Sequence, residues 1–232
     1  MEGNRMKRNS IIIAALAVCA LMMSSCMSTK NTRASLYPKM YNEDPVVLVV
    51  MPPINNTTNV EAKELLYTSI NTPLIEAGYY VVSPHVTMEL LKAESAYDAE
   101  MFVDGNVSQF GKVFGADAVV FTVIDTWKKS GFGIETKLHY IIKSTKTNEV
   151  LFERSCDLYL DLSEKSRNSA TGQESTMLIA SLIKTAVTDH IVAARKCNAF
   201  ILSDIPGGKY APWYKQDGKT AAQPKDIKAT VR

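Results

Sequence analysis

A continuous apolar run near residue 50 constrains the fold of this chain more than any other feature. Residues 46–51 read Val-Val-Leu-Val-Val-Met, and Pro52-Pro53 end the run. A strand with apolar, mostly β-branched residues at every position is typical of a strand buried on both faces of its sheet. Parallel sheets covered by helices on both sides bury their strands in this way. The run therefore predicts a central parallel strand of an α/β domain.

The segments that follow alternate between helix and strand patterns. Asn59 is suited to cap a helix, Gly78 stands where that helix should end, and Pro73 should kink it. Residues 79–82 have the pattern of a second strand, and Ser83-Pro84 is a typical helix start. The same alternation continues with a short helix at 107–114 and a third buried strand at 118–124.

The second half of the chain changes periodicity. Apolar and polar residues alternate over 136–142 and again over 150–158, which predicts an antiparallel hairpin. A long final helix follows from the Thr171-x-x-Glu174 capping box and from apolar residues at helical spacing up to Ala194. The expected fold is a single α/β domain with a mixed sheet, a β-α-β-α start, an antiparallel hairpin and a long C-terminal helix packed on the sheet.

The first 26 residues have the pattern of a bacterial export signal. Basic residues precede an apolar run at 11–23, which ends in Ser24-Ser25-Cys26. The run is shorter than the roughly 20 residues that cross a bilayer as a helix. A cysteine after two small residues marks the lipoprotein variant of such signals, so we expect cleavage before Cys26 and lipid on its sulfur. A secreted protein without lipid is the alternative.

These patterns divide the chain into four parts. We expect a signal peptide over 1–25, a lipidated tether over 26–44 and the α/β domain over 45–216. Residues 217–232 are polar, contain Pro and Lys and lack periodicity, so we expect them to form a disordered tail.

The charge of the mature chain restricts its partners. Removing residues 1–25 takes away three of the 26 basic residues and one of the 24 acidic residues, which leaves 23 of each. Nucleic-acid binding depends on the neutralisation of phosphates, so a neutral chain without a basic stripe argues against it. The same neutrality gives no electrostatic attraction to a membrane, and a lipid would have to provide the attachment.

The sequence contains no recognisable catalytic or metal-binding pattern. It lacks a G-x-S-x-G turn and a phosphate-binding glycine loop, and its three histidines stand far apart without a ligand partner at metal-binding spacing. His139 should point outward, and His190 is more typical of a hydrogen-bonded core histidine than of a ligand. We therefore expect a protein that is not an enzyme and that has no cofactor.

Two segments could still bind something. Pro52, Pro53, Asn55 and Asn56 leave the carboxyl end of the first strand, where open α/β sheets bind ligands, although the same residues make an ordinary structural turn, the interpretation we favour. Trp127 and Phe132 flank a short Lys-Lys-Ser-Gly segment. They could form an exposed loop that contacts a partner or could cover an edge of the sheet.

Two cysteines remain in the mature chain besides Cys26. Cys156 falls in a predicted strand and Cys197 near a predicted helix end. In an oxidising periplasm they could form a disulfide, whereas the alternative is that both are small buried core residues.

Three stretches, VVMPPINN at 49–56, PLIEAGYYV at 73–81 and FGADA at 114–118, resemble a family of bacterial lipoproteins of unknown function that includes a meningococcal vaccine candidate. The resemblance spans about residues 45–200, and residues 208–214 are similar to the family's Gly/Pro/Tyr-containing end. That family is similar in fold to the TolB amino-terminal domain, to the curli secretion lipoprotein CsgG and to lipoprotein activators of peptidoglycan synthases. The resemblance implies a small α/β domain that binds envelope proteins and brings no catalytic residues.

Together these observations lead to a functional hypothesis. The chain is expected to be a non-enzymatic envelope lipoprotein, anchored by Cys26 in the outer membrane and facing the periplasm, that scaffolds or assists a secretion, transport or cell-wall complex. Its partners would be envelope proteins, among them a CsgG-like lipoprotein. The alternative is a small-ligand binder or enzyme that uses the mouth near Asn55 and Asn56. The broad apolar arc of the last helix could also support a homo-oligomer, with simple core burial as the alternative.

Overall fold

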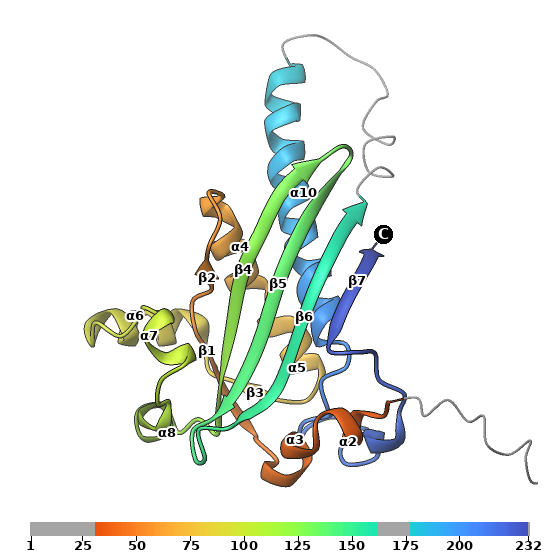
Figure 1. Ribbon diagram of the computed structural model, residues 1–232. Helices are drawn as coiled ribbons and strands as arrows, with labels where there is room; N and C mark the ends of the chain where they lie inside the picture. The colour runs from red at the N-terminus through yellow and green to blue at the C-terminus, as the bar shows by residue number, and fades with distance from the viewer. Residues whose placement is uncertain (1–30, 162–176, 232) are drawn as a thin grey trace, which may run out of the picture. The chain divides into compact units, whose positions relative to one another are not determined.

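The computed structural model describes residues 31–161 and 177–231, and it describes side chains in the last helix from His190 onward. The signal segment, Cys26, the Thr171-x-x-Glu174 box and the apolar side chains over 178–189 lie outside the described residues, so the predictions made for them remain predictions. Figure 1 shows the arrangement of the described elements.

A mixed sheet of seven strands forms the centre of the described fold. Its order is β3-β1-β4-β5-β6-β7, and β2 also pairs with β4. β1 is parallel to both of its neighbours, which confirms the predicted central parallel strand. β4, β5 and β6 form an antiparallel meander, and β7 is parallel to β6. The strands are β1 (Val47–Val50), β2 (Ile54–Asn55), β3 (Tyr80–Val81), β4 (Ala118–Ser130), β5 (Gly133–Ser144), β6 (Val150–Asp161) and β7 (Asp226–Val231).

The helices begin and end largely where local sequence signals place them. Asn59 caps α4 by accepting a hydrogen bond from the Ala62 amide at 3.0 Å, and Gly115 ends α8 in the left-handed conformation. The helix expected to kink at Pro73 is divided at Ile70. The helices are α2 (Arg33–Leu36), α3 (Pro38–Glu43), α4 (Val60–Ser69), α5 (Asn71–Glu76), α6 (Pro84–Ala93), α7 (Glu100–Val103), α8 (Ser108–Phe114), α10 (Met177–Leu202) and the 3-10 turn η2 (Asp217–Lys219).

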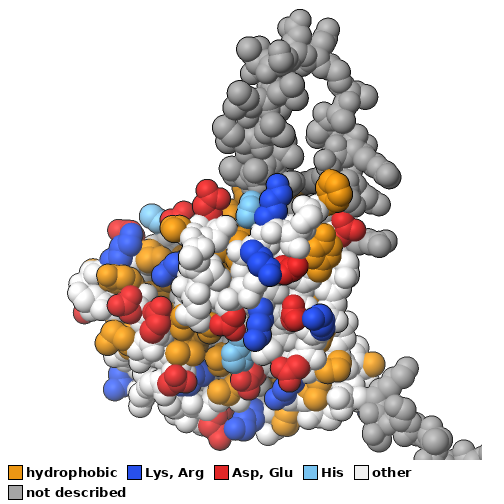
Figure 2. All heavy atoms as spheres, turned by 45° about the horizontal axis from the view of Figure 1, so that its top comes forward, with side chains coloured by type: hydrophobic (Ala, Val, Ile, Leu, Met, Phe, Trp, Pro, Cys, Tyr) orange, Lys and Arg blue, Asp and Glu red, His pale blue; other side chains and the backbone are white. Residues whose placement is uncertain are grey.

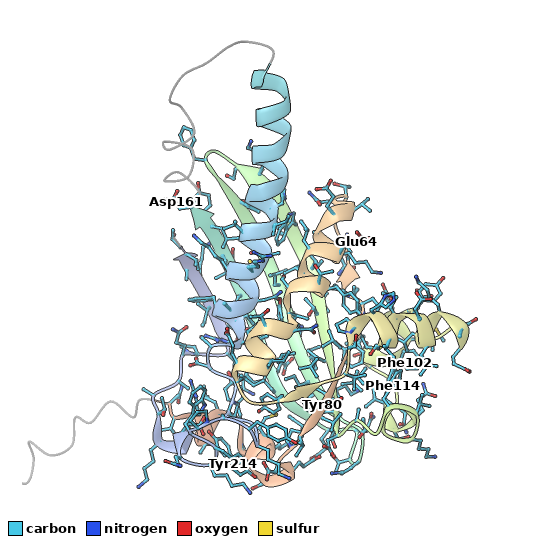
Figure 3. The ribbon with its side chains drawn as sticks, turned by 180° about the vertical axis from the view of Figure 1, so that it is seen from behind. Glu64, Tyr80, Phe102, Phe114, Asp161 and Tyr214 are labelled. Atoms are coloured by element: carbon cyan, nitrogen blue, oxygen red, sulfur yellow. The ribbon has the colours of Figure 1, made fainter. Side chains whose placement is uncertain are left out.

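Two hydrophobic cores lie on opposite faces of the sheet, and β1 contributes to both. Leu48 and Val50 face the core that α4, α5 and α10 cover, whereas Val49 and Met51 face the core under α6, α7 and α8. Figure 3 shows α10, α4 and α5 on the first face. Burial of each such side chain stabilises the fold by about 1.5–3 kcal/mol, which explains the continuous apolar run. The predicted α/β architecture with a C-terminal helix on the sheet is confirmed.

The part of the sheet beyond the second core is charged and faces solvent. Lys128 pairs with Glu135 across β4 and β5 at 2.8 Å, and His139 points outward as predicted and lies 3.0 Å from Glu153. Figure 2 shows Lys/Arg and Asp/Glu side chains intermingled on the face it displays. Such exposed pairs contribute little stability individually, and their mixture gives this face no single charge.

The segment around Trp127 corrects one of the predicted alternatives. Residues 125–135 are not a loop, because β4 and β5 continue through them and meet at the two-residue turn Gly131-Phe132. Trp127 is buried under α10, and its Nε1 donates a hydrogen bond to His190 Nδ1 at 2.9 Å. Of these two aromatic residues, Phe132 is the exposed one, at the tip of the hairpin. His190 is thus a hydrogen-bonded histidine packed beside the core, as expected.

The described structure continues past both ends of the expected domain. Within the expected tether, α2 and α3 surround the buried Tyr37 and Met40. The expected disordered tail contains η2 and β7. Polar residues are ordered at both ends because their backbone groups are paired. β7 extends the sheet next to β6, and Thr32 forms a β-bridge with Ala221. Such pairing needs no apolar periodicity, so the sequence pattern did not reveal it.

The two cysteines are unpaired and buried in the first core. Cys156 lies on β6 and Cys197 on α10, where its sulfur lies 3.6 Å from the Thr136 hydroxyl. Burial raises the pKa of Cys156 to about 11 and the pKa of Cys197 to about 12. The disulfide considered from the sequence is therefore not formed, and the alternative of two small core residues describes their positions.

Candidate protein-interaction site

Helices α6 and α8 carry apolar residues on more than the face that covers the sheet. Thr87 and Leu91 of α6 are buried, while Val86 and Leu90, one turn apart, are exposed. On α8, Phe110 is buried and Val113 is 57% exposed. A helix that only covers a core shows one apolar stripe with polar residues opposite, so a second apolar face has another use.

The two helices enclose a groove. Its volume is about 320 Å³.

 The floor of this groove is aromatic, because the Phe110 ring stacks on the Phe114 ring with centroids 6.1 Å apart and meets the Phe102 ring edge-on at 5.1 Å. Figure 3 shows Phe102 and Phe114 near each other on α7 and α8. The lining residues are Leu90, Leu91, Glu94, Ala96, Gln109, Phe110, Val113 and Phe114.

Hydrogen bonds from the end of β5 and from the β5–β6 connection hold the segments next to this groove. The Lys143 ammonium donates to the carbonyl oxygens of Val103 at 3.0 Å and Gly105 at 2.7 Å, at the end of α7. The Asn148 side chain accepts from the Val107 amide at 3.0 Å, just before α8. These contacts satisfy backbone groups that helix ends leave free. The groove is therefore a preformed feature of the fold.

The surroundings of the groove are apolar and acidic. We use the name groove surface for the groove together with the exposed side chains of Val86, Tyr97 and Met101 beside it. Residues 84–114 contain five acidic and two basic residues, a net charge of −3. Exposed apolar patches of this kind mark contacts with other molecules.

The turn after β1 has the geometry of a structural turn. Pro52 and Pro53 are buried. The Asn55 amide donates to the Asn59 carbonyl oxygen at 2.8 Å, and its own oxygen accepts from the Thr57 amide and hydroxyl. Asn56 donates to Asp125 at 3.1 Å. Both ends of the Asn55 side chain are thus engaged inside the turn, which fits the interpretation we favoured from the sequence.

The described residues offer little for catalysis. Among residues 31–161 and 177–231, no group of three or more His, Cys, Asp or Glu side chains could hold a metal ion. His139 and His190 are engaged with Glu153 and Trp127, and the raised pKa values of Cys156 and Cys197 keep both thiols protonated near neutral pH.

Comparison with known proteins gives the family. Residues 36–207 match the family model described as "Putative lipoprotein GNA1162-like". This chain belongs to that family. A curated member of Neisseria meningitidis serogroup B, named "Putative lipoprotein NMB1124/NMB1162", is 28% identical over 120 residues, which are 52% of this chain and 54% of the relative. The chain thus spans about half the length of this curated GNA1162-like relative.

Solved structures are similar at low sequence identity. Lipoprotein GNA1162 from Neisseria meningitidis is 19% identical with a TM-score of 0.45, and the match covers 62% of this chain and 99% of that one. A PelC dodecamer from Paraburkholderia phytofirmans is 13% identical with a TM-score of 0.38, over 72% and 90% of the two chains. The LpoB C-terminal domain from Escherichia coli is 14% identical with a TM-score of 0.35, over 53% and 94%.

Membership of the GNA1162-like family gives this chain the character of an envelope-associated lipoprotein. Neither the family model nor the curated relative is described as an enzyme. Of the helices in the part of the chain that the structure describes, none is long and apolar enough to span a membrane.

The FGADA stretch that resembles this lipoprotein family has a structural role. Gly115 ends α8, and the Asp117 carboxylate accepts hydrogen bonds from the amides of Val46 and Val47 at 3.0 and 3.1 Å. Partial burial opposes ionisation of Asp117, but Lys146 at 2.9 Å and the two amides outweigh it and lower its pKa. Asp117 therefore fixes the start of β1 beside β4.

The other glycine-tyrosine stretch of the family meets the C-terminal segment. Gly78 has a φ of +88°, and a Cβ there would lie 2.2 Å from the Ala211 nitrogen. The buried Tyr79 hydroxyl donates to the Pro206 carbonyl oxygen at 2.6 Å. Two stretches that support the family resemblance, 73–81 and 208–214, are therefore packed against each other.

The sequence contains a signal for the groove surface. Residues 84–114 combine a second apolar face on each helix with an acidic excess. That combination is unusual for helices that only cover a sheet.

Proposed function

We propose that this chain is a non-enzymatic envelope lipoprotein, anchored through Cys26 in the outer membrane and facing the periplasm, and that it acts by binding another envelope protein. The observation that carries the proposal is the groove surface, an apolar groove with a preformed aromatic floor and exposed apolar side chains around it. Through this contact the protein would assist the assembly of a secretion, transport or cell-wall complex. The family membership supports the lipid anchor.

The shape and charge of the groove surface favour an amphipathic helix as its occupant. α6 has ten residues and is therefore about 15 Å long, enough to flank about three turns of a bound helix. Helices that bind in grooves insert an apolar face between two elements of their partner. Because residues 84–114 carry a net charge of −3, the bound helix should have Lys or Arg on both sides of its apolar stripe.

Site-specific photo-crosslinking in intact cell envelopes tests this proposal. A photoreactive residue at Val113 should give one discrete adduct, and the crosslinked peptide of the partner should be amphipathic and basic. Val60 is the matched control, because it is an exposed valine at the start of α4, on the other face of the sheet. A probe at Val60 should give no such adduct.

Substitution separates specific contact from mere proximity. Leu90→Glu should abolish the adduct formed at position 113, because it places a carboxylate in an apolar groove that is already acidic. The same adduct at positions 60 and 113, an adduct unaffected by Leu90→Glu, or no adduct at 113 would each count against the proposal.

A further inference from the structure

The first described residues are held against the C-terminal segment of the chain. The Arg33 amide donates to the Thr220 carbonyl oxygen at 3.0 Å, and the Ala222 amide donates to the Asn31 carbonyl oxygen at 2.8 Å. Asn31 stands five positions after Cys26, so the chain from one to the other can span at most about 17 Å. If Cys26 carries lipid, as proposed above, this end of the domain must stay close to the bilayer.

A buried carboxylate fixes the arrangement at this end. Asp217 accepts hydrogen bonds from the Arg33 guanidinium at 2.9 Å, the Tyr41 hydroxyl at 3.0 Å and the Gly207 amide at 2.8 Å. The Arg33 guanidinium also donates to the Ser203 carbonyl oxygen at 2.8 Å. These bonds hold the C-terminal segment beside α2 and α3, where Figure 1 shows it.

Aromatic side chains are exposed beside this junction. Tyr210 is 65% and Trp213 43% exposed, and the Trp213 ring lies against Gly207. Trp213 and Arg33 line the same hollow, of about 440 Å³. The Tyr210 amide donates to the Gly78 carbonyl oxygen. This bond places Tyr210 near Ile75 and Tyr80, two exposed residues on either side of Gly78. We use the name tether-side surface for Ile75, Tyr80, Lys209, Tyr210, Trp213 and Lys219.

The exposed charges of the C-terminal segment are positive. Residues 203–225 contain four lysines and two aspartates, and both aspartates, Asp204 and Asp217, are buried. Lys209 and Lys219 are exposed on either side of Trp213. Exposed tryptophan and tyrosine combined with lysine is the composition that proteins place at a membrane interface, where the rings sit at headgroup depth and lysine attracts anionic lipid.

We propose that the tether-side surface contacts the anionic phospholipid bilayer in which Cys26 is anchored. The contact can be weak, because a short tether keeps it at a high effective concentration beside the membrane. The contact would give the domain a defined orientation on the membrane. This inference rests on the proposed lipid anchor, but it concerns a surface separate from the groove.

Fluorescence quenching of the mature lipoprotein tests the contact. The protein is reconstituted into phosphatidylethanolamine/phosphatidylglycerol vesicles with or without brominated acyl chains. Trp213 should lose most of its emission in the brominated vesicles, whereas the buried Trp127 should keep it. Comparing the wild type with Trp213→Phe isolates the Trp213 signal, and Trp127→Phe provides the complementary measurement.

Charge substitutions and a sedimentation control complete the design. Lys209→Glu with Lys219→Glu should reduce the quenching, whereas Lys63→Glu with Lys112→Glu should not. Protein that does not sediment with the vesicles would contradict the lipid anchor itself. Protein that sediments but shows equal quenching of both tryptophans would overturn the membrane contact. Protection of Trp213 from aqueous iodide in native envelopes but not in vesicles would assign the surface to a protein instead.

Discussion

The groove surface and the tether-side surface are built in opposite ways. The groove surface comes from one continuous segment, residues 84–114, and is acidic around an apolar groove. The tether-side surface combines Ile75 and Tyr80 with residues of the C-terminal segment, which the junction with residues 31–33 holds in place, and the exposed charges of that segment are positive. One is assembled from neighbouring helices and the other by a buried carboxylate that joins distant segments. The two surfaces should therefore respond differently to the same kind of substitution.

The largest contrast should come from two glycines with left-handed backbone. Gly78→Ala places a Cβ 2.2 Å from the Ala211 nitrogen, so we expect a loss of about 3–5 kcal/mol of unfolding free energy. Gly115→Ala has no atom within 4 Å of its Cβ and should cost only the backbone strain, about 1–2 kcal/mol. Urea unfolding of both variants measures the difference. Equal losses in the two variants would mean that the close packing of Gly78 against Ala211 contributes nothing to the unfolding free energy.

Removal of the buried charge should loosen the tether-side surface next. Asp217→Asn leaves the Arg33 guanidinium without its ion pair, and we expect a loss of about 2–3 kcal/mol. Limited proteolysis should then cut within residues 203–222 while residues 84–114 remain protected. Glu89→Gln, which breaks an exposed pair with Lys92, is the control and should change neither measurement.

The corresponding contact under the groove surface should be weaker. Lys143→Met removes the donor to the Val103 and Gly105 carbonyl oxygens and should cost about 1–2 kcal/mol. Hydrogen exchange should increase at the end of α7 and not in residues 203–222. Faster exchange in both regions would show that the two surfaces are coupled.

The core between the surfaces should make the whole domain sensitive to alkali. Burial raises the pKa of Cys156 to about 11 and those of Cys197 and Tyr37 to about 12. Above pH 9 the unfolded chain releases these protons while the folded chain keeps them, so stability falls as pH rises from about 9 toward 12. Urea midpoints across this range test the sign. The same burial predicts that neither thiol reacts with an alkylating reagent at pH 8 until the protein unfolds.

The smallest stability effect is expected at the groove itself. Val113→Glu and Val60→Glu alter exposed side chains, so each should change the unfolding free energy by less than about 0.5 kcal/mol. Only Val113→Glu should weaken partner binding. A large loss of stability in Val113→Glu would indicate that the residue belongs to the core and not to a binding surface.

How well the sequence predicted each surface follows from how that surface is built. The helices that form the groove were predicted because Ser83-Pro84 and Gly115 are local signals. β1 was predicted because burial on both faces leaves a continuous apolar run. In both cases the information lies within a few residues of the element that it specifies.

The tether-side surface was not predicted because its determinants are distant from one another. Nothing near Asp217 indicates that Arg33, 184 positions earlier, neutralises it in the fold. β7 is ordered by backbone pairing with β6, which the sequence pattern of 226–231 does not record. The long β4–β5 hairpin was missed for a similar reason, since Trp127 becomes a core residue only through its contact with α10 and His190.

The junction of residues 31–33 with residues 217–222 also joins two segments that are far apart along the chain. Closing so long a loop costs conformational entropy before the contact can form, and contacts of this kind form slowly in folding. Residues 31–33 therefore have no folded partner until the C-terminal segment has docked, and the start of the domain should become ordered only at the end of folding.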